Sequence, residues 1–139
     1  MKTSMTIQAR EAALLAAACI QAAETRKVAI AVAVVDSSGQ PLRLERMDGA
    51  RGFSSDLATR KARTATIIGV STGMLAASLN GRPLHSPDLI AVAGGAPLVH
   101  LSTLAGGVGV SGGTPEQDED IVAAAITEFE QVVSAGNKP

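Results

Sequence analysis

A glycine-rich run that leads directly into a capped helix constrains this chain more than any other segment. It extends from Gly109 to Asp120 and reads GVSGGTPEQDED. Thr114 suits the N-cap, Pro115 suits the first helical position, and Gln117 completes a Thr-x-x-Gln capping box. The segment therefore predicts a strand that ends at the glycines and a helix that begins at Pro115.

The same segment allows two chemical interpretations. Gly112 and Gly113 can turn tightly and expose N–H groups at the positive end of the helix dipole, which is a geometry that holds anions. Glu116 and Asp118 would repel an anion there, and they favour a simple capped connection instead. We therefore expect the glycines to shape one wall of a pocket, with Ser111 as a ligand contact.

Length and composition limit the class of protein. The chain has 139 residues and is expected to form a single domain over residues 1–139. It has no Trp or Tyr and only two Phe, so the core must be aliphatic, and self-association is expected to cover part of the apolar surface. A net charge of −1 without a basic run argues against nucleic-acid binding.

The first helix superficially resembles a signal peptide. Its apolar run from Ala12 to Ile20 is flanked by Arg10, Glu11 and Gln21, and no apolar run approaches the roughly 18 residues of a membrane span. We expect an amphipathic helix in a cytoplasmic protein with no membrane partner. Cys19 is the only cysteine, which excludes an intrachain disulfide, and it is expected to be a buried apolar residue.

Hydrophobic periodicity and turn signals predict four helices and five strands. Short turns between strands favour an antiparallel sheet, and the bracketing helices favour an α+β layered domain. The expected helices cover residues 6–26, 54–68, 72–79 and 115–134, and the expected strands cover 28–35, 41–47, 89–92, 98–101 and 106–110.

Five motifs, in this order, resemble those of the GlcG/HbpS family, which also includes the C-terminal domain of PduO-type proteins. The resemblance covers roughly residues 5 to 134. The motifs are Val34-Val35-Asp36-x-x-Gly39, Arg46-Met47-Asp48-Gly49-Ala50, Ala58-x-x-Lys61-Ala62-x-Thr64-Ala65, Gly94-Gly95-x-Pro97 and Gly109-Val110-Ser111-Gly112-Gly113-Thr114-x-x-Gln117-Asp118.

The resemblance implies a profilin-like α/β/α sandwich with a central antiparallel five-stranded sheet. It also implies a homo-oligomer, either a dimer or a larger ring up to an octamer, and it makes haem a candidate cofactor. One departure from the family concerns the turn of the last hairpin. Members join these strands with an Asp-Gly or Asn-Gly turn, whereas this chain has Ser102 to Gly107, which predicts a looser or differently registered hairpin.

A pocket for an organic anion is the sharpest chemical hypothesis. Adjoining elements carry Arg46, Asp48, Ser54, Ser55 and Lys61, which could converge beside Ser111. Arg46 offers a planar fork and Lys61 a point charge for a carboxylate. Alternatively, Arg46 pairs with Asp48, and Lys61 lies along the helix surface. The family motif adds Gly95 and Pro97 to the expected ligand-binding set.

Two histidines are the only imidazoles. His85 lies in a loop from which it could ligate haem iron, whereas His100 lies in an apolar strand and is expected to be structural. Met47 and Met74 are further candidate iron ligands. The sequence contains no His-Glu-x-x-His motif and no haem-attachment motif, so it does not predict a zinc site.

These observations leave two functional hypotheses. The first is an accessory protein that binds haem or an organic acid near an oligomer interface. The second is a small cofactor-free enzyme that acts on a carboxylic acid, with Lys61 or Asp48 as its acid/base group. No complete set of catalytic residues can be named, because the serines lack a Gly-x-Ser-x-Gly elbow and Ser111 has no evident histidine base.

Overall fold

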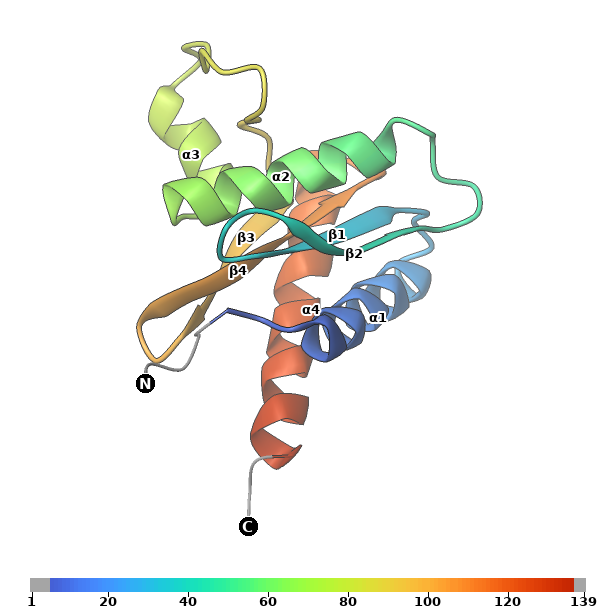
Figure 1. Ribbon diagram of the computed structural model, residues 1–139. Helices are drawn as coiled ribbons and strands as arrows, with labels where there is room; N and C mark the ends of the chain where they lie inside the picture. Colours follow the sequence, from blue (N-terminus) through green and yellow to red (C-terminus); the bar gives the residue numbers. More distant parts are fainter. Residues whose placement is uncertain (1–5, 137–139) are drawn as a thin grey trace.

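The computed structural model describes residues 6–136, and they form three layers. Four strands make one antiparallel sheet in the order β2-β1-β4-β3. Helices α1 and α4 cover one face of this sheet and α2 covers the other, with α3 beside it (Figure 1). In chain order the elements are α1 (Ala9–Thr25), β1 (Ala31–Asp36), β2 (Pro41–Arg46), α2 (Ser54–Ile68), α3 (Thr72–Leu79), β3 (Gly95–His100), β4 (Thr103–Ser111) and α4 (Pro115–Gly136).

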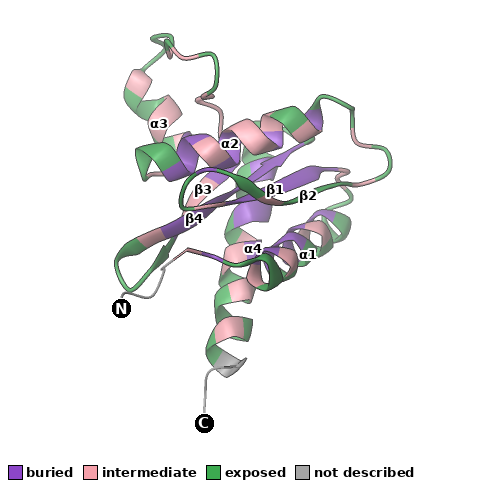
Figure 2. Cartoon of the chain, viewed as in Figure 1, coloured by how far each residue is buried: buried purple, intermediate pink, exposed green. Residues whose placement is uncertain are grey.

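The larger core lies between the sheet and the helices α1 and α4. Side chains alternate along a strand, so Val32 and Val34 of β1 and Val108 of β4 point into this layer. They pack with Leu15 of α1 and Ile121 of α4, and all five side chains are fully buried. Figure 2 shows the buried residues concentrated in the central strands β1 and β4 and on the inward sides of the helices. The core is aliphatic, as the composition predicted.

The opposite face of the sheet is lined by small residues, which lets α2 approach closely. Ala31 and Ala33 of β1 pack there against Ala58 and Ala62 of α2. A Cβ added to Gly109 of β4 would collide with the Ala58 carbonyl and would lie 2.6 Å from the Ala62 nitrogen. The absence of a side chain at this position therefore sets the depth of α2, which carries Lys61.

The expected fifth strand, at residues 89–92, is not a strand, so the described sheet has four strands rather than five. The backbone of this segment bonds to side chains of α2 instead of to a neighbouring strand. The Ile90 amide donates to Thr64 Oγ1 at 2.9 Å, and the Leu89 carbonyl accepts from Arg60 Nη2 at 3.3 Å. Its apolar residues therefore tie a loop to a helix.

The last hairpin is tighter than the sequence predicted. Leu101 and Ser102 connect β3 and β4, with φ values of 51° and 63°. Positive φ at both turn residues is typical of two-residue hairpins, and here it occurs without Asn or Gly. The register shifts between Leu98 and Val99. Of the two alternatives that the sequence left open, the looser connection is wrong, and a register different from that of the family stays a prediction.

Helices α1 and α4 both begin at capping boxes, and only the box of α4 was predicted. At α4, the Gln117 amide donates to Thr114 Oγ1 at 3.1 Å and the Thr114 amide donates to Gln117 Oε1 at 2.9 Å, which confirms the prediction. At α1 the cap is Gln8, and Thr6, where the expected helix 6–26 starts, bonds instead to Ser37 and Ala105.

Cys19 is buried in α1, and burial raises the pKa of its thiol to about 12, so it is an apolar core residue. None of the helices in residues 6–136 is long and apolar enough to cross a membrane.

Candidate functional site

A pocket of about 160 Å³ lies where α2 and α4 begin and β4 ends. We call it the ion-pair pocket, because it contains a buried ion pair. Its lining residues are Arg51, Phe53, Ser54, Leu57, Lys61, Val92, Ser111, Gly112, Gly113, Pro115 and Asp118.

Lys61 crosses from α2 to the end of the sheet and is only 3% exposed. Its ammonium donates to the Val110 carbonyl at 2.9 Å and to Asp118 Oδ2 at 3.1 Å. A lysine ammonium has three N–H donors, and the third has no partner among the described residues. Lys61 is therefore a buried cation in the lining of the pocket, with two of its three N–H donors used, and not a lysine that lies along the helix surface.

The Asp118 carboxylate lies at the helix start, where the amides of the glycines were expected to bind an anion. Its Oδ1 accepts from the Gly113 amide at 2.9 Å, while its Oδ2 faces Lys61. Burial raises the pKa of the Asp118 carboxyl above its ordinary value of 3.8, and this effect exceeds the opposing charge of Lys61 and the hydrogen bonds from Lys61, Gly113 and Gly112. The helix start thus binds an internal carboxylate.

Two hydroxyls and a cationic rim complete the pocket. Ser54 is fully buried, and its Oγ has no hydrogen-bond partner within the part of the chain that the structure describes. Ser111 is 4% exposed and lines the same pocket from the end of β4. At the rim, the Arg51 guanidinium lies 5.9 Å from the centre of the exposed Phe53 ring. The site therefore offers several hydrogen-bond donors in a confined space.

The structure brings together some of the residues that the sequence singled out. Lys61 and Ser111 line the ion-pair pocket together. Gly95 lies directly behind it, because a Cβ at Gly95 would be 2.5 Å from the Lys61 carbonyl oxygen. The second helix and the glycine-rich strand end therefore meet at this pocket, with the Gly-Gly motif behind them.

Four other expected residues do not line this pocket. Arg46 donates to the Gly52 carbonyl at 3.3 Å, and Asp48 is exposed in the loop that follows β2. The Arg46–Asp48 pairing is not among the ion pairs of the described residues. Ser55 lies next to the lining residue Ser54, but outside the lining. Pro97 pairs with Gly107 of β4, which lies two residues before Gly109, the glycine next to Lys61.

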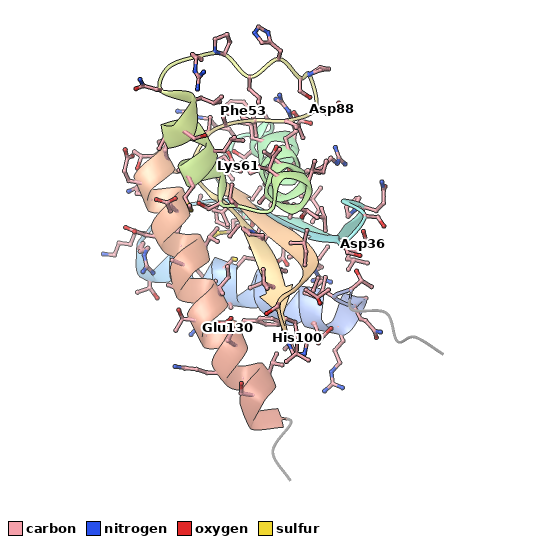
Figure 3. The ribbon with its side chains drawn as sticks, turned by 90° about the vertical axis from the view of Figure 1, so that its left-hand side faces the viewer. Asp36, Phe53, Lys61, Asp88, His100 and Glu130 are labelled. Atoms are coloured by element: carbon pink, nitrogen blue, oxygen red, sulfur yellow. The ribbon has the colours of Figure 1, made fainter. Side chains whose placement is uncertain are left out.

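The candidate iron ligands are dispersed. His85 is exposed in the loop between α3 and β3, and His100 is exposed at the end of β3 rather than enclosed in an apolar strand. Figure 3 shows Phe53 and Lys61 toward one end of the sheet and His100 toward the other. Met47 Sδ accepts from the Ile30 amide at 3.4 Å, and Met74 is 64% exposed. In residues 6–136, no group of three His, Cys, Asp or Glu side chains could hold a metal ion.

Sequence reasoning named Ser54 as a candidate but missed two charged residues of the pocket, Arg51 and Asp118. Asp118 was interpreted only as a helix-dipole residue, although it follows the capping-box residue Gln117 directly. A signal was present, since position 118 lies one helical turn after Thr114 and can fold back toward the glycines. Only the folded chain shows that Lys61, 57 residues away, is its partner.

Comparison with known proteins identifies relatives of this chain. The family described as "Haem degrading protein HbpS-like" matches residues 7–127. The corrinoid adenosyltransferase PduO of Citrobacter freundii is 34% identical over 130 residues, which are 88% of this chain and 39% of that protein. The chain therefore spans about two fifths of the length of this relative.

Two solved structures share the fold over nearly the whole chain. A double mutant of HbpS from Streptomyces reticuli is 33% identical with a TM-score of 0.85, and the match covers 92% of this chain and 90% of that one. A complex of PduOC with haem is 31% identical with a TM-score of 0.81, and the match covers 88% and 94%. The chain thus belongs to the HbpS-like family, the GlcG/HbpS family that its motifs indicated.

Proposed function

We propose that this chain is a ligand-binding protein whose ion-pair pocket takes the polar end of a small organic acid. The observation that carries the proposal is the unused N–H donor of the buried Lys61 ammonium. A buried donor without a partner costs about 1–3 kcal/mol, so a ligand carboxylate that accepts from it is stabilised. The hydroxyls of Ser54 and Ser111 lie on the walls of the same pocket and would gain partners too.

The size and charge of the pocket narrow the class of ligand. Its volume of about 160 Å³ is smaller than the roughly 300–1,000 Å³ of pockets that enclose drug-sized molecules. Asp118 balances the charge of Lys61, so the net positive charge at the site comes from Arg51 at the rim. A small hydroxy acid fits these conditions, with its carboxylate toward Lys61 or Arg51 and its hydroxyl toward the serines.

Haem is the second candidate ligand, and the haem complex of PduOC favours it. A whole macrocycle does not fit into about 160 Å³, but a propionate arm does. We propose that an arm would enter beside Lys61 and that the ring would lie over the rim, where Phe53 is 57% exposed. His85, proposed from the sequence as an iron ligand, lies outside the lining of this pocket, so haem binding here does not require it.

An enzyme remains the alternative class, and one observation favours it. A carboxyl group whose pKa is raised in a pocket can donate a proton at a higher pH than an ordinary aspartate. In this alternative Asp118 is the general acid, and Lys61 orients it. Asp48, the acid/base candidate that the sequence offered beside Lys61, is exposed and outside the pocket, so it does not serve this role.

Self-association and a cytoplasmic location complete the proposal. Several large apolar side chains are exposed, among them Phe53 at the pocket rim, and the outer sides of β2 and β3 are sheet edges. A second copy that covered Phe53 would place the ion-pair pocket next to an oligomer interface. Fractionation of cells that produce the tagged chain would test the location.

Isothermal titration with glycolate and lactate, and absorbance titration with haemin, test the proposal. Ser111→Ala and Arg51→Ala should each weaken binding of the accepted ligand about tenfold or more. Ser55→Ala is the matched control, because it changes a serine next to the pocket without changing the lining. Binding that is absent from the wild type, or equal in all variants, would overturn the proposed site. Turnover of an acid that Asp118→Asn abolishes would favour the enzyme instead.

A further inference from the structure

A second and larger pocket lies between α2, α3 and the segment 81–91. Its volume is about 390 Å³, within the range of pockets that enclose small organic ligands. We call it the arginine pocket, and it shares no lining residue with the ion-pair pocket. Its lining residues are Arg60, Ala76, Leu79, Gly81, Arg82, Leu84, Ser86, Leu89 and Ala91.

The two arginines are held in place by backbone carbonyls. Arg60 Nη2 donates to the carbonyls of Pro87 and Leu89, at 3.2 and 3.3 Å. Arg82 donates to the Leu79 carbonyl at 2.9 Å and to the Ser78 carbonyl at 3.2 Å, at the end of α3. Both guanidinium groups are therefore positioned by neutral acceptors, and their full positive charges remain.

No carboxylate in the lining of the pocket balances the positive charge of the two arginines. Its lining contains two guanidinium groups and no carboxylate. The carboxylate paired with Arg60 is Asp56, at 4.0 Å, and its side chain is 74% exposed, so solvent screens this contact. In addition, Arg60 Nε is buried without a hydrogen-bond partner among the described residues. A guanidinium whose charge is not balanced by a neighbouring carboxylate favours a bound carboxylate.

Five aliphatic residues, with Gly81 and Ser86, make up the rest of the lining. Leu79, Leu84 and Leu89 line the pocket from α3 and from the two arms of the loop, with Ala76 and Ala91 between them. An inorganic anion would satisfy the arginines and leave these side chains in contact with water. A ligand with an apolar body would cover them and gain about 25 cal/mol for each Å² of apolar surface removed from water.

From this combination we infer that the arginine pocket binds an amphipathic carboxylate, with the carboxylate at Arg60 and Arg82 and an aliphatic body against the leucines. This site is separate from the proposed small-acid site. The segment 81–91 forms one wall of it, and the bonds from Arg60 to Pro87 and Leu89 hold that segment in place. The segment that fails to become a strand is thus a wall of this site.

Isothermal titration with octanoate and with acetate tests the inference. Octanoate should bind saturably at one site per chain and acetate should bind at least about tenfold more weakly, because it lacks the apolar body. Arg82→Gln should weaken octanoate binding about tenfold or more. Arg26→Gln is the matched control, since Arg26 likewise donates to a carbonyl, that of Ala22, at the end of α1, but lies outside the pocket.

Further variants and a second ligand distinguish binding at this site from binding at the ion-pair pocket. Ser111→Ala should leave octanoate affinity unchanged, whereas a loss there would assign octanoate to the other pocket and overturn the inference. Leu84→Ser should weaken octanoate without changing phosphate binding. Tighter binding of phosphate than of octanoate, an equal loss with Arg26→Gln, or no saturable binding would each contradict an amphipathic carboxylate site.

Discussion

The Lys61 ammonium lies 3.1 Å from the Asp118 carboxylate, and both side chains are only 3% exposed. The pair joins the middle of α2 to the first turn of α4 across the end of β4. Removing two charges from water is costly, and replacing such pairs by apolar residues is often neutral or stabilising. Because the pair also lines a pocket with unused hydrogen-bond donors, its location favours a role in binding over one in stability alone.

Lys61→Met should destabilise the fold strongly at neutral pH. The variant leaves the Asp118 carboxylate buried without its cation, and breaking one side of a buried pair costs about 3–5 kcal/mol. Lys61 lowers the pKa of Asp118 in the native protein, so its removal should raise that pKa further. The loss should therefore shrink on acidification, as urea unfolding at several pH values would measure. The double variant Lys61→Met/Asp118→Leu should recover stability, and a double variant as unstable as the single one would refute this.

The free energy of unfolding of the native protein should depend on pH through the titration of Asp118. Its pKa in the fold lies above 3.8, so the folded state retains this proton to a higher pH than the unfolded state. The corresponding stabilisation is fully present below the unfolded pKa and is lost as the pH rises through the folded pKa. The free energy of unfolding of the wild type minus that of Asp118→Asn should therefore fall as the pH increases through this window.

Glu116→Gln provides the control for that measurement. Glu116 lies in the same helical turn but is exposed. The difference between wild type and Glu116→Gln should not fall in this way with rising pH. A difference for Asp118→Asn that rose with pH would mean that the ion pair lowers the pKa of Asp118, contrary to the direction expected from its burial.

Local signals in the sequence predicted most elements of the fold. The capping box at Thr114 and Gln117 was sufficient to locate the start of α4, because both partners lie within one turn. The apolar run that contains Val32 and Val34 was sufficient for β1. Residues 89–92 misled the same reasoning, because their backbone partners Arg60 and Thr64 lie on a different element. Short apolar runs do not reveal such long-range bonds.

Only part of the candidate site was predicted, again because the sequence does not reveal partners that lie far apart along the chain. Lys61 and Ser111 were found through motifs, but the choice of Arg46 and Asp48 assumed that neighbours in sequence converge in space. The structure directs Arg46 to the Gly52 carbonyl and brings Asp118 to Lys61 from 57 residues away. Charge complementarity alone cannot rank such partners, because the chain contains 13 acidic residues.

The chain should self-associate at micromolar concentrations. Leu101 and Val99 at the tip of the last hairpin are 78% and 57% exposed, and Met74 on α3 is 64% exposed. Burying such side chains in a partner removes apolar area from water and favours association. Light scattering should give a mass that is a multiple of 14.0 kDa. A monomer over the whole micromolar range would refute this, and Leu101→Ser should weaken association if the hairpin tip forms the contact.

Gly109→Ala should show that the missing side chain at this position sets the geometry of the site. The new Cβ would collide with the Ala58 carbonyl and come within 3.0 Å of the Lys61 Cβ, so α2 would have to move away from the sheet. Overpacking of this kind costs about 1–3 kcal/mol, and the shift would also move Lys61 relative to the Val110 carbonyl. Chemical denaturation and titration with glycolate should therefore show a lower stability together with a weaker affinity. Gly52→Ala is the matched control, because its Cβ would meet only the flexible end of Arg46 at 3.4 Å. If Gly109→Ala is as stable as the wild type and binds glycolate equally well, the close approach of α2 to β4 does not position Lys61.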